Sequence, residues 1–401
     1  MVDDFLYDRL MKSTGSSRSP LADELTRRRF LKAAGVAGAG TLLPGILAAC
    51  GATSASSSVG AVTTKAHGAA SEAPSRGGVL RVAMIGNGAS ETFNPAIIQT
   101  PIDFVHAYSV FDPMVRVAPG YSTSPGLITD WTPNADNTVW ELKLRQGVTW
   151  QNGKTFTADD VIYTLHTMGS PANFGYPAVV NIRLRDVKKL GDYIVQVPLH
   201  SANNRLYDQF IYGTSALVIQ DGATHFSKPV GTGPYKLTTF EPGHQAVLTA
   251  NRDYWDQPYP YPDQLEVLSI DDDTARVNAL ASGAVDIINP MPFAEAKAAL
   301  ASPPGDYQVL LGAPGRPMTF YMRVDRPPFS DNRVRTALKL SLNRPALIEA
   351  AFSGIGTVAN DVLGDGLPLY DHGLPQRVQD IEQAKSLLKS AGQSDLRISL
   401  D

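Results

Sequence analysis

The segment before residue 51, and the single cysteine that ends it, limit what this chain of 401 residues can fold into. Residues 26–32 read TRRRFLK and lead into an uncharged apolar run, residues 33–49, which stops at Cys50. A pair of arginines before such a run is typical of a twin-arginine signal, which directs folded proteins across a bacterial membrane. The residues that carry this pattern are Arg27, Arg28, Phe30, Leu31 and Lys32. Because the chain has one cysteine, its folded part cannot depend on an internal disulfide or a cluster of cysteine ligands.

The apolar run is of borderline length for a membrane span, and it contains several glycines and a proline. These residues weaken a spanning helix, so we expect a hydrophobic region that is cleaved off. Residues 47–50 read LAAC and are similar to a bacterial lipobox, in which the cysteine receives a diacylglyceryl group and becomes the new N-terminus. Two acyl chains attach a protein lastingly where one is marginal. We therefore predict lipidation of Cys50 and an extracytoplasmic location on the outer face of the cytoplasmic membrane, at the cell surface or in the periplasm. The alternative is an uncleaved signal anchor with an incidental cysteine.

The composition is that of an ordinary globular protein with more than one domain. The chain has 43% hydrophobic and 18% charged residues and a formal net charge of −4. Its length is too great for one simple core and suggests two or three domains. The acidic balance gives no support to nucleic-acid binding, which requires a basic surface. Residues 50–76 are rich in Ala, Ser, Thr and Gly, which predicts a flexible tether after a signal peptide over residues 1–49.

The remaining chain mixes strand and helix patterns without a fixed repeat. Alternation and turn residues predict strands over residues 79–84, 138–144, 265–270 and 285–288, and a further strand entered through residues 231–237. Helical spacing and start signals predict helices over residues 103–111, 157–168, 274–283, 331–352 with an interruption at Pro345, and 381–391. Asn152 and Gly153 predict a hairpin turn, because both tolerate positive φ. This mixture is typical of the α/β fold class.

Several blocks of residues, in a fixed order, resemble the bacterial extracellular solute-binding proteins of family 5, the dipeptide-, oligopeptide- and nickel-binding group that serves ABC importers. The resemblance runs from Gly77 to the last residue. Its blocks are FNP (93–95), LKLRQGV (142–148), NGKTFTADDV (152–161), GTGPY (231–235), NRDYW (251–255), residues 276–286, PFSDNRVR (328–335) and AKSLL (384–388). Arg323 stands where the family usually has asparagine, and Asn343 where it usually has aspartate. Most of the block residues, including Trp255, are expected to be structural. The same role is expected of Trp140, which lies just before the block at residues 142–148.

The resemblance implies a two-lobed, periplasmic-binding-protein-like fold of type II with an extra small β-rich domain. The lobes would be hinged around a cleft that closes on the ligand. The expected divisions are lobe I over residues 77–114 and 214–322, the extra domain over 115–213, and the start of lobe II over 323–401. Family members continue beyond this point, whereas residues 396–401 read as the middle of an alternating strand. We therefore expect a fragment or a truncated gene product with an incomplete second lobe; a natural compact variant is the alternative.

Three segments align with stretches that line the cleft in the family: residues 88–91, 289–290 and 318–321. In peptide binders of this family, main-chain hydrogen bonds hold an extended peptide much as an added strand would. Backbone groups of the first two segments and aromatic surface of the third are therefore the expected contacts, with ordinary loop and core roles as the alternative. The candidate ligand-binding residues are Ala89, Ser90, Glu91, Asn289, Phe320 and Tyr321.

No motif supports catalysis, a cofactor or a metal site. The chain has neither a Gly-x-Ser-x-Gly elbow nor a His-Glu-x-x-His helix, and its 7 histidines are scattered. Residues 271–273 are three aspartates, but no calcium loop with alternating ligands follows. Carboxylates just ahead of Thr274 more readily favour the dipole of a helix N-terminus. Residues 86–88 lack the later glycine and the lysine of a phosphate loop.

These observations predict a binding protein and not an enzyme: an extracytoplasmic, lipid-anchored monomer that captures short peptides and delivers them to an ABC permease. Ligand would favour the closed state because that state binds it better. Nickel chelates, oligosaccharides and other solutes are alternative ligands, since the family covers them. A sensory or structural lipoprotein without a transport role is the alternative from another functional class.

Overall fold

The computed structural model describes residues 74–399 with gaps at 119–121, 213–215, 313–317 and 363–369. The export signal, Cys50 and most of the expected tether lie outside the described residues. The strands are β1 (Val79–Met84), β2 (Val115–Ala118), β3 (Ser122–Pro125), β4 (Ile128–Pro133), β5 (Val139–Leu144), β6 (Lys188–Gly191), β7 (Ile194–Pro198), β8 (Tyr235–Glu241), β9 (Gln245–Ala250), β10 (Gln264–Ser269) and β11 (Ile287–Asn289). The α-helices are α3 (Pro101–Val110), α4 (Ala158–Met168), α5 (Tyr176–Val179), α6 (Leu206–Tyr212), α7 (Asp273–Ala281), α8 (Phe293–Ala301), α9 (Asn332–Ser341), α10 (Arg344–Phe352) and α11 (Ile381–Ser390). Within these ranges, no helix is both long and apolar enough to cross a membrane.

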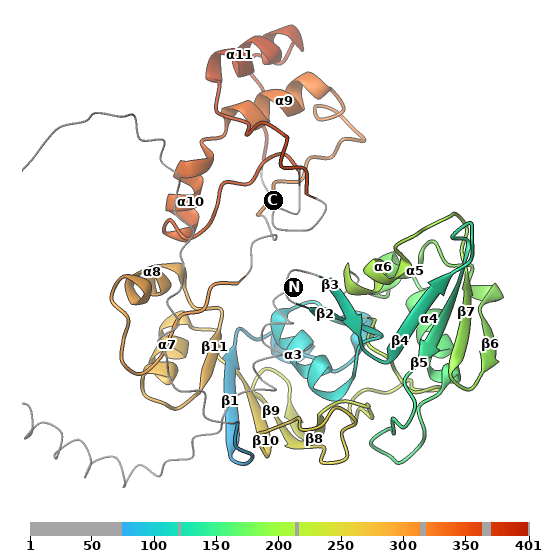
Figure 1. The fold of residues 1–401 in the computed structure, drawn as a ribbon. Helices are drawn as coiled ribbons and strands as arrows, with labels where there is room; N and C mark the ends of the chain where they lie inside the picture. The colour runs from blue at the N-terminus through green and yellow to red at the C-terminus, as the bar shows by residue number, and fades with distance from the viewer. Residues whose placement is uncertain (1–73, 119–121, 213–215, 313–317, 363–369, 400–401) are drawn as a thin grey trace, which may run out of the picture.

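A five-stranded sheet in the order β11-β1-β10-β9-β8 carries helix α3 (Figure 1). β1 runs parallel to β10 and β11, whereas β9 runs antiparallel to β10 and β8. The second half of β1 is buried throughout, as expected for a strand between two parallel neighbours. Ile102 of α3 shares one buried apolar cluster with Val82 and Val267 of the sheet. The chain enters β8 past Gly231, where a Cβ atom would overlap the carbonyl oxygen of Val110.

A second sheet, antiparallel in the order β4-β5-β7-β6, has its own core. Trp140 lies in this core and is 2% exposed, in agreement with the structural role expected for it. Helix α4 contributes Val161 and Leu165 to the same cluster and begins at the capping box predicted at Thr157. The predicted turn at residues 152–153 is present, with φ of +84° at Gly153. Strands β2 and β3 form a separate two-stranded ribbon.

Asp112 ties the two cores together where the chain passes from one to the other. Its side chain is fully buried. The carboxylate accepts hydrogen bonds from Thr232 Oγ1 at 2.9 Å, Tyr254 Oη at 2.7 Å and Trp255 Nε1 at 2.8 Å. A guanidinium nitrogen of Arg116 lies 3.4 Å from the same carboxylate. Three donors and a cation thus compensate the loss of hydration that burial imposes on the charge.

Trp255 belongs to both cores, as its side chain packs against each of the two buried clusters. The guanidinium carbons of Arg116 and Arg145 lie 4.8 Å and 4.2 Å from the centre of its ring, within the range of a cation–π interaction. Arg145 also donates from Nε to the carbonyl oxygen of Gly126 at 3.0 Å. Burial lowers the pKa of the Arg145 guanidinium from its ordinary value, and the charge of Arg116 acts in the same direction.

Helices α9, α10 and α11 form a third group, which lies above the sheets in Figure 1. α9 and α11 pack through a small buried cluster of Ala337, Leu340 and Ala384. The helical pattern of residues 331–352 is interrupted as predicted, but the break falls just before Pro345, which occupies the first turn of α10. Asn343 caps this helix by accepting a hydrogen bond from the Ala346 N–H at 3.1 Å. Asparagine is among the residues preferred at the N-cap of a helix.

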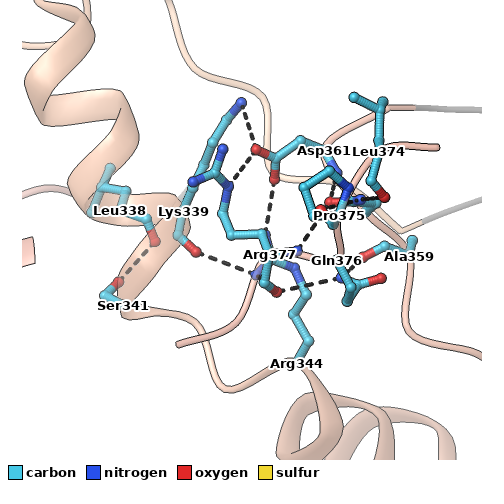
Figure 2. A network of polar contacts seen from close by, with 11 residues as sticks. Leu338, Lys339, Ser341, Arg344, Ala359, Asp361, Leu374, Pro375, Gln376 and Arg377 are labelled. Atoms are coloured by element: carbon cyan, nitrogen blue, oxygen red, sulfur yellow. Dashed lines mark hydrogen bonds and ion pairs between the residues drawn. The ribbon is translucent and has the colours of Figure 1, made fainter. Parts of the chain in front are cut away.

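Asp361 fastens the stretch after α10 to the ends of α9 and α10 (Figure 2). Its carboxylate lies 3.1 Å from Arg344 Nη2, 2.5 Å from Arg377 Nε and 3.5 Å from Lys339 Nζ. Burial alone would raise the pKa of Asp361. The hydrogen bond from Arg377 and the charges of Lys339 and Arg377 outweigh burial and hold the pKa below its ordinary value.

One predicted element is wrong. Residues 396–399 alternate as a strand would, but they form no strand in the structure. Alternation gives a segment two different faces, whereas a strand also needs a neighbour to share its backbone hydrogen bonds. By contrast, β1 covers the predicted residues 79–84.

Candidate functional site

The carboxyl ends of three parallel strands meet at one edge of the five-stranded sheet. The strand register places Met84 of β1 beside Ser269 of β10 and beside Asn289 of β11. The loops that follow these strands therefore lie at the same edge. In sheets of this kind, ligands bind outside the carboxyl ends of the strands. Two of the three segments predicted from the sequence, residues 88–91 and 289–290, are at this edge, which we take as the candidate ligand site.

The loop after β1 presents main chain to solvent and is fixed from beneath. Gly88, Ala89 and Ser90 form an exposed 3₁₀ turn. The N–H of Gly86 donates to Asp271 Oδ1 at 2.8 Å, which joins this loop to the one after β10. Gly88 has φ of +56°, and a Cβ at Gly243 would lie 3.0 Å from the Gly88 Cα. The exposed turn therefore rests directly on the hairpin between β8 and β9.

Glu91 lies beneath this loop and is only 5% exposed. Its Oε1 accepts hydrogen bonds from the Asn87 N–H at 3.1 Å and from the Ser269 hydroxyl. Its Oε2 is buried without a hydrogen-bond partner among the described residues. The structure thus places the Glu91 carboxylate under the loop, where it connects the loop to β10, while Ala89 and Ser90 face outward.

His106 of α3 is buried behind the loop, and no pattern in the sequence singles it out. Its ring stacks on Phe93 at 4.8 Å and meets Phe240 edge-on at 5.3 Å. Neither ring nitrogen makes a hydrogen bond within the described residues. The main chain of Thr92 raises the pKa of His106, but by less than the other groups around the ring change it. Burial lowers the pKa of His106 to about 4, although the charges of Glu91 and Asp103 act in the opposite direction. The ring is therefore neutral at pH 7.

Arg276 is the second residue at this edge that sequence analysis missed as a site residue. Its side chain, on α7, is fully buried. It donates from Nε to the Pro290 carbonyl at 3.0 Å and from Nη1 to the Ile270 carbonyl at 2.8 Å. Its Nη2 pairs with the carboxylate of Asp273. One guanidinium therefore contacts the loop after β10 and the loop after β11.

The three aspartates at the start of α7 are each engaged within the fold. Asp271 accepts from the Gly86 N–H, Asp272 caps α7 by accepting from the Ala275 N–H at 2.7 Å, and Asp273 pairs with Arg276. Among the described residues, no group of three or more His, Cys, Asp or Glu side chains is placed to hold a metal ion. This geometry agrees with the helix N-terminus interpretation of residues 271–273.

The third predicted segment, residues 318–321, lies on the stretch between α8 and α9. Met318, Phe320 and Tyr321 are 80%, 55% and 90% exposed. In the part of the chain that the structure describes, no ring contact or hydrogen bond joins Phe320 or Tyr321 to the loop after β1. The structure therefore presents their aromatic surface to solvent and does not bring it onto Ala89, Ser90 or Asn289.

Helices α8 and α10 connect the site-bearing sheet to the α9–α11 group (Figure 1). The rings of Phe293 and Phe352 meet edge-on at 5.0 Å. Lys297 Nζ lies 2.9 Å from Glu349 Oε1, with both side chains largely exposed. Because α8 follows the turn after β11 directly, this contact is next to the candidate site along the chain.

Two known proteins similar to this chain are named for the peptides or the glutathione that they bind. The chain is 29% identical over 339 residues to the di/tripeptide-binding protein 2 of Pseudomonas aeruginosa, covering 76% of this chain and 62% of the relative. It is 26% identical over 271 residues to the glutathione-binding protein GsiB of Shigella boydii, covering 66% of this chain and 52% of the relative. The chain thus spans between half and two thirds of the length of these relatives.

Solved structures share the fold. A TM-score of 0.66 at 21% identity relates the chain to the periplasmic binding protein DppA of Helicobacter pylori in complex with the peptide STSA, covering 80% of this chain and 67% of that one. AppA of Bacillus subtilis in complex with a nonapeptide gives 0.64 at 22% identity, covering 79% and 64%. These neighbours are two-lobed periplasmic binding proteins, and the predicted α/β fold class is confirmed.

Two family models match separate parts of the chain. The model of the twin-arginine translocation signal matches residues 24–44, which confirms the predicted export signal and supports an extracytoplasmic, periplasmic location. The model of the bacterial extracellular solute-binding proteins, family 5 middle, matches residues 122–399, more than half of the chain. The chain therefore belongs to the bacterial extracellular solute-binding proteins of family 5.

Proposed function

We propose that this protein captures short peptides outside the cytoplasm and delivers them to the permease of an ABC importer. The observation that carries the proposal is the exposed main chain of residues 88–90 at the carboxyl ends of the parallel strands. This backbone is held from beneath by Asp271, Gly243 and Glu91. Main-chain groups in a fixed position hydrogen-bond an extended peptide whatever its side chains are.

The similar proteins support the same class of ligand. The relatives are named for di- and tripeptides and for glutathione, and two structural neighbours hold peptides. Within this proposal, Ala89, Ser90 and Asn289 supply backbone contacts, Glu91 supports the loop, and Phe320 and Tyr321 offer aromatic surface to the ligand from the stretch between α8 and α9.

Transport would follow from a difference in affinity between two states. If the closed state binds the peptide better than the open state, the peptide shifts the population toward closure, and the permease recognises the closed form. Because no covalent step is required, the proposal is for a binding protein and not for an enzyme. We propose that it acts as a monomer. The lobe division at residues 323–401 and the extra domain at residues 115–213 are part of this proposal.

Isothermal titration of the full chain with dialanine, trialanine and glutathione tests the peptide function. We expect at least one of these probes to bind with Kd in the range of about 1 μM, equivalent to about −8 kcal/mol. Alanine and maltotriose serve as controls, because neither offers an extended peptide backbone. Binding of maltotriose with no heat from any peptide would point to a different solute class.

We also propose that Cys50 carries a diacylglyceryl group, which attaches the exported protein to the outer face of the membrane. The sequence LAAC at residues 47–50 follows the apolar run directly. Replacing Cys50 with alanine is expected to abolish incorporation of a labelled fatty acid and to shift the protein from the membrane to the soluble extracytoplasmic fraction. A Ser54→Ala variant is the matched control. Labelling that persists in the Cys50→Ala variant would contradict the proposal.

A further inference from the structure

Arg276 makes contacts that the strand ladder of the sheet cannot make. In the order β11-β1-β10, strands β10 and β11 are both neighbours of β1 and are not paired with each other. The carbonyl of Ile270 lies just beyond β10, and that of Pro290 just beyond β11. Arg276 donates to both, at 2.8 Å and 3.0 Å. Its guanidinium therefore bridges the two loops that flank the carboxyl end of β1.

The turn after β11 has fewer other contacts to hold it than the loop after β1, so it depends more on its hydrogen bond from Arg276. β11 has only three residues and lies at the edge of the sheet, so few ladder hydrogen bonds fix its end. The loop after β1, by contrast, is held by Asp271, Glu91 and the contact with Gly243. The contact from Arg276 Nε to the Pro290 carbonyl therefore holds the turn at residues 289–290 at a set separation from the loop after β1.

The burial of Arg276 argues for a role beyond stability. Its guanidinium is fully buried, whereas its carboxylate partner Asp273 is 60% exposed. Solvent weakens the attraction in this half-exposed pair, so the buried guanidinium acts chiefly through the geometry of its hydrogen bonds to the Ile270 and Pro290 carbonyls. The two carbonyls are contacted by different nitrogens of the guanidinium, Nε and Nη1, whereas all three N–H donors of a lysine ammonium are on one nitrogen.

We propose that Arg276 is a positioning residue for ligand binding: it holds the turn after β11 so that its main chain and that of residues 88–90 contact one ligand together. This inference rests on the proposed peptide function. It assigns to Arg276 no contact with the ligand itself.

Replacing Arg276 with lysine tests the inference, because lysine keeps the charge and loses the bridge. We expect Kd for the peptide probe that binds the wild type to rise roughly tenfold, which corresponds to about 1.4 kcal/mol. We also expect amide hydrogen exchange to accelerate at residues 270–273 and at Asn289 and Met291, the two residues of the 289–292 turn that carry an amide hydrogen, and not in β4–β7. This second readout is local and does not require a ligand.

Arg145→Lys is the matched control. Arg145 also donates from Nε to a carbonyl, that of Gly126 at 3.0 Å, but it lies at the junction of the two cores and away from the carboxyl ends of β1, β10 and β11. We expect this variant to lose stability while keeping the affinity of the wild type. The melting temperature of each variant, measured alongside, separates loss of fold from loss of positioning.

Wild-type affinity in the Arg276→Lys variant would overturn the inference. Equal weakening of binding by the two substitutions would do the same, because it would reflect stability alone. A wild-type chain that binds none of the probes contradicts the proposed peptide function and, with it, a role of Arg276 in peptide binding. Hydrogen exchange then still tests whether Arg276 holds the turn: unchanged exchange at Asn289 and Met291 would show that it does not.

Discussion

Replacing Asp112 with alanine is expected to lower the free energy of unfolding by about 3–5 kcal/mol, the usual cost of removing one partner from a buried charged network. The substitution leaves Thr232 Oγ1, Tyr254 Oη and Trp255 Nε1 without the acceptor that each now has. It also removes the buried carboxylate next to Arg116. Urea denaturation followed by tryptophan fluorescence measures the change, since Trp255 itself reports on the junction.

Asp256→Ala is the control for this prediction. Asp256 pairs with the same Arg116 at 2.7 Å, but it is partly exposed. Partly exposed ion pairs contribute about 0–1 kcal/mol, so this substitution should have a small effect. Asp112→Asn should fall between the two, because the amide keeps one oxygen acceptor. Similar losses for Asp112→Ala and Asp256→Ala would show that the hydrogen bonds around Asp112 do not hold the two cores together.

His106 is expected to make the folded state more sensitive to acid. Its pKa is about 4 in the folded protein, because of burial, and about 6.5 in an unfolded chain. Between pH 4 and pH 6.5, His106 binds a proton more readily in the unfolded state than in the folded state. The stabilising contribution of the neutral His106 is therefore complete above pH 6.5 and is lost as the pH falls toward 4. The difference corresponds to about 3 kcal/mol. Urea denaturation at intervals from pH 4.5 to pH 7 measures it.

Comparison with a His106→Phe variant isolates this contribution from that of the carboxylates. Phenylalanine fits the aromatic surroundings of Phe93 and Phe240 and cannot bind a proton, so the stability of this variant should change less with pH. Replacing the exposed His200 with glutamine should leave the pH dependence of the wild type in place. If His106→Phe retains the wild-type slope, the histidine is not the group that titrates.

Local chemistry made much of the fold predictable from the sequence. β5 was predicted from its own alternation, α4 from the capping residues at Thr157, and the turn at Gly153 from its tolerance of positive φ. Each of these signals lies within a few residues of the element that it specifies. The strand expected at residues 396–399 is wrong for the complementary reason, since a strand requires a partner that no local pattern supplies.

The candidate site was only partly predictable, because its key contacts join residues far apart in the sequence. Gly86 and Asp271 are 185 positions apart, and Glu91 and Ser269 are 178 apart. No spacing rule connects such pairs. The sequence therefore indicated the loop at residues 88–91 but not that Glu91 turns beneath it, and it gave no sign that Arg276 bridges two strand ends. The available hint was that Arg276 is the one basic residue of α7, close to the start of the helix.

The small cluster that joins α9 and α11 has a consequence for how the protein survives outside the cytoplasm. Ala337, Leu340 and Ala384 bury little apolar surface, whereas each of the two sheets has a core with large aromatic and aliphatic side chains. Segments with few buried contacts open and reclose on their own, at a lower free energy than global unfolding. Limited proteolysis of this 401-residue chain is therefore expected to cut in and around α9 and α11 before it cuts the two sheets.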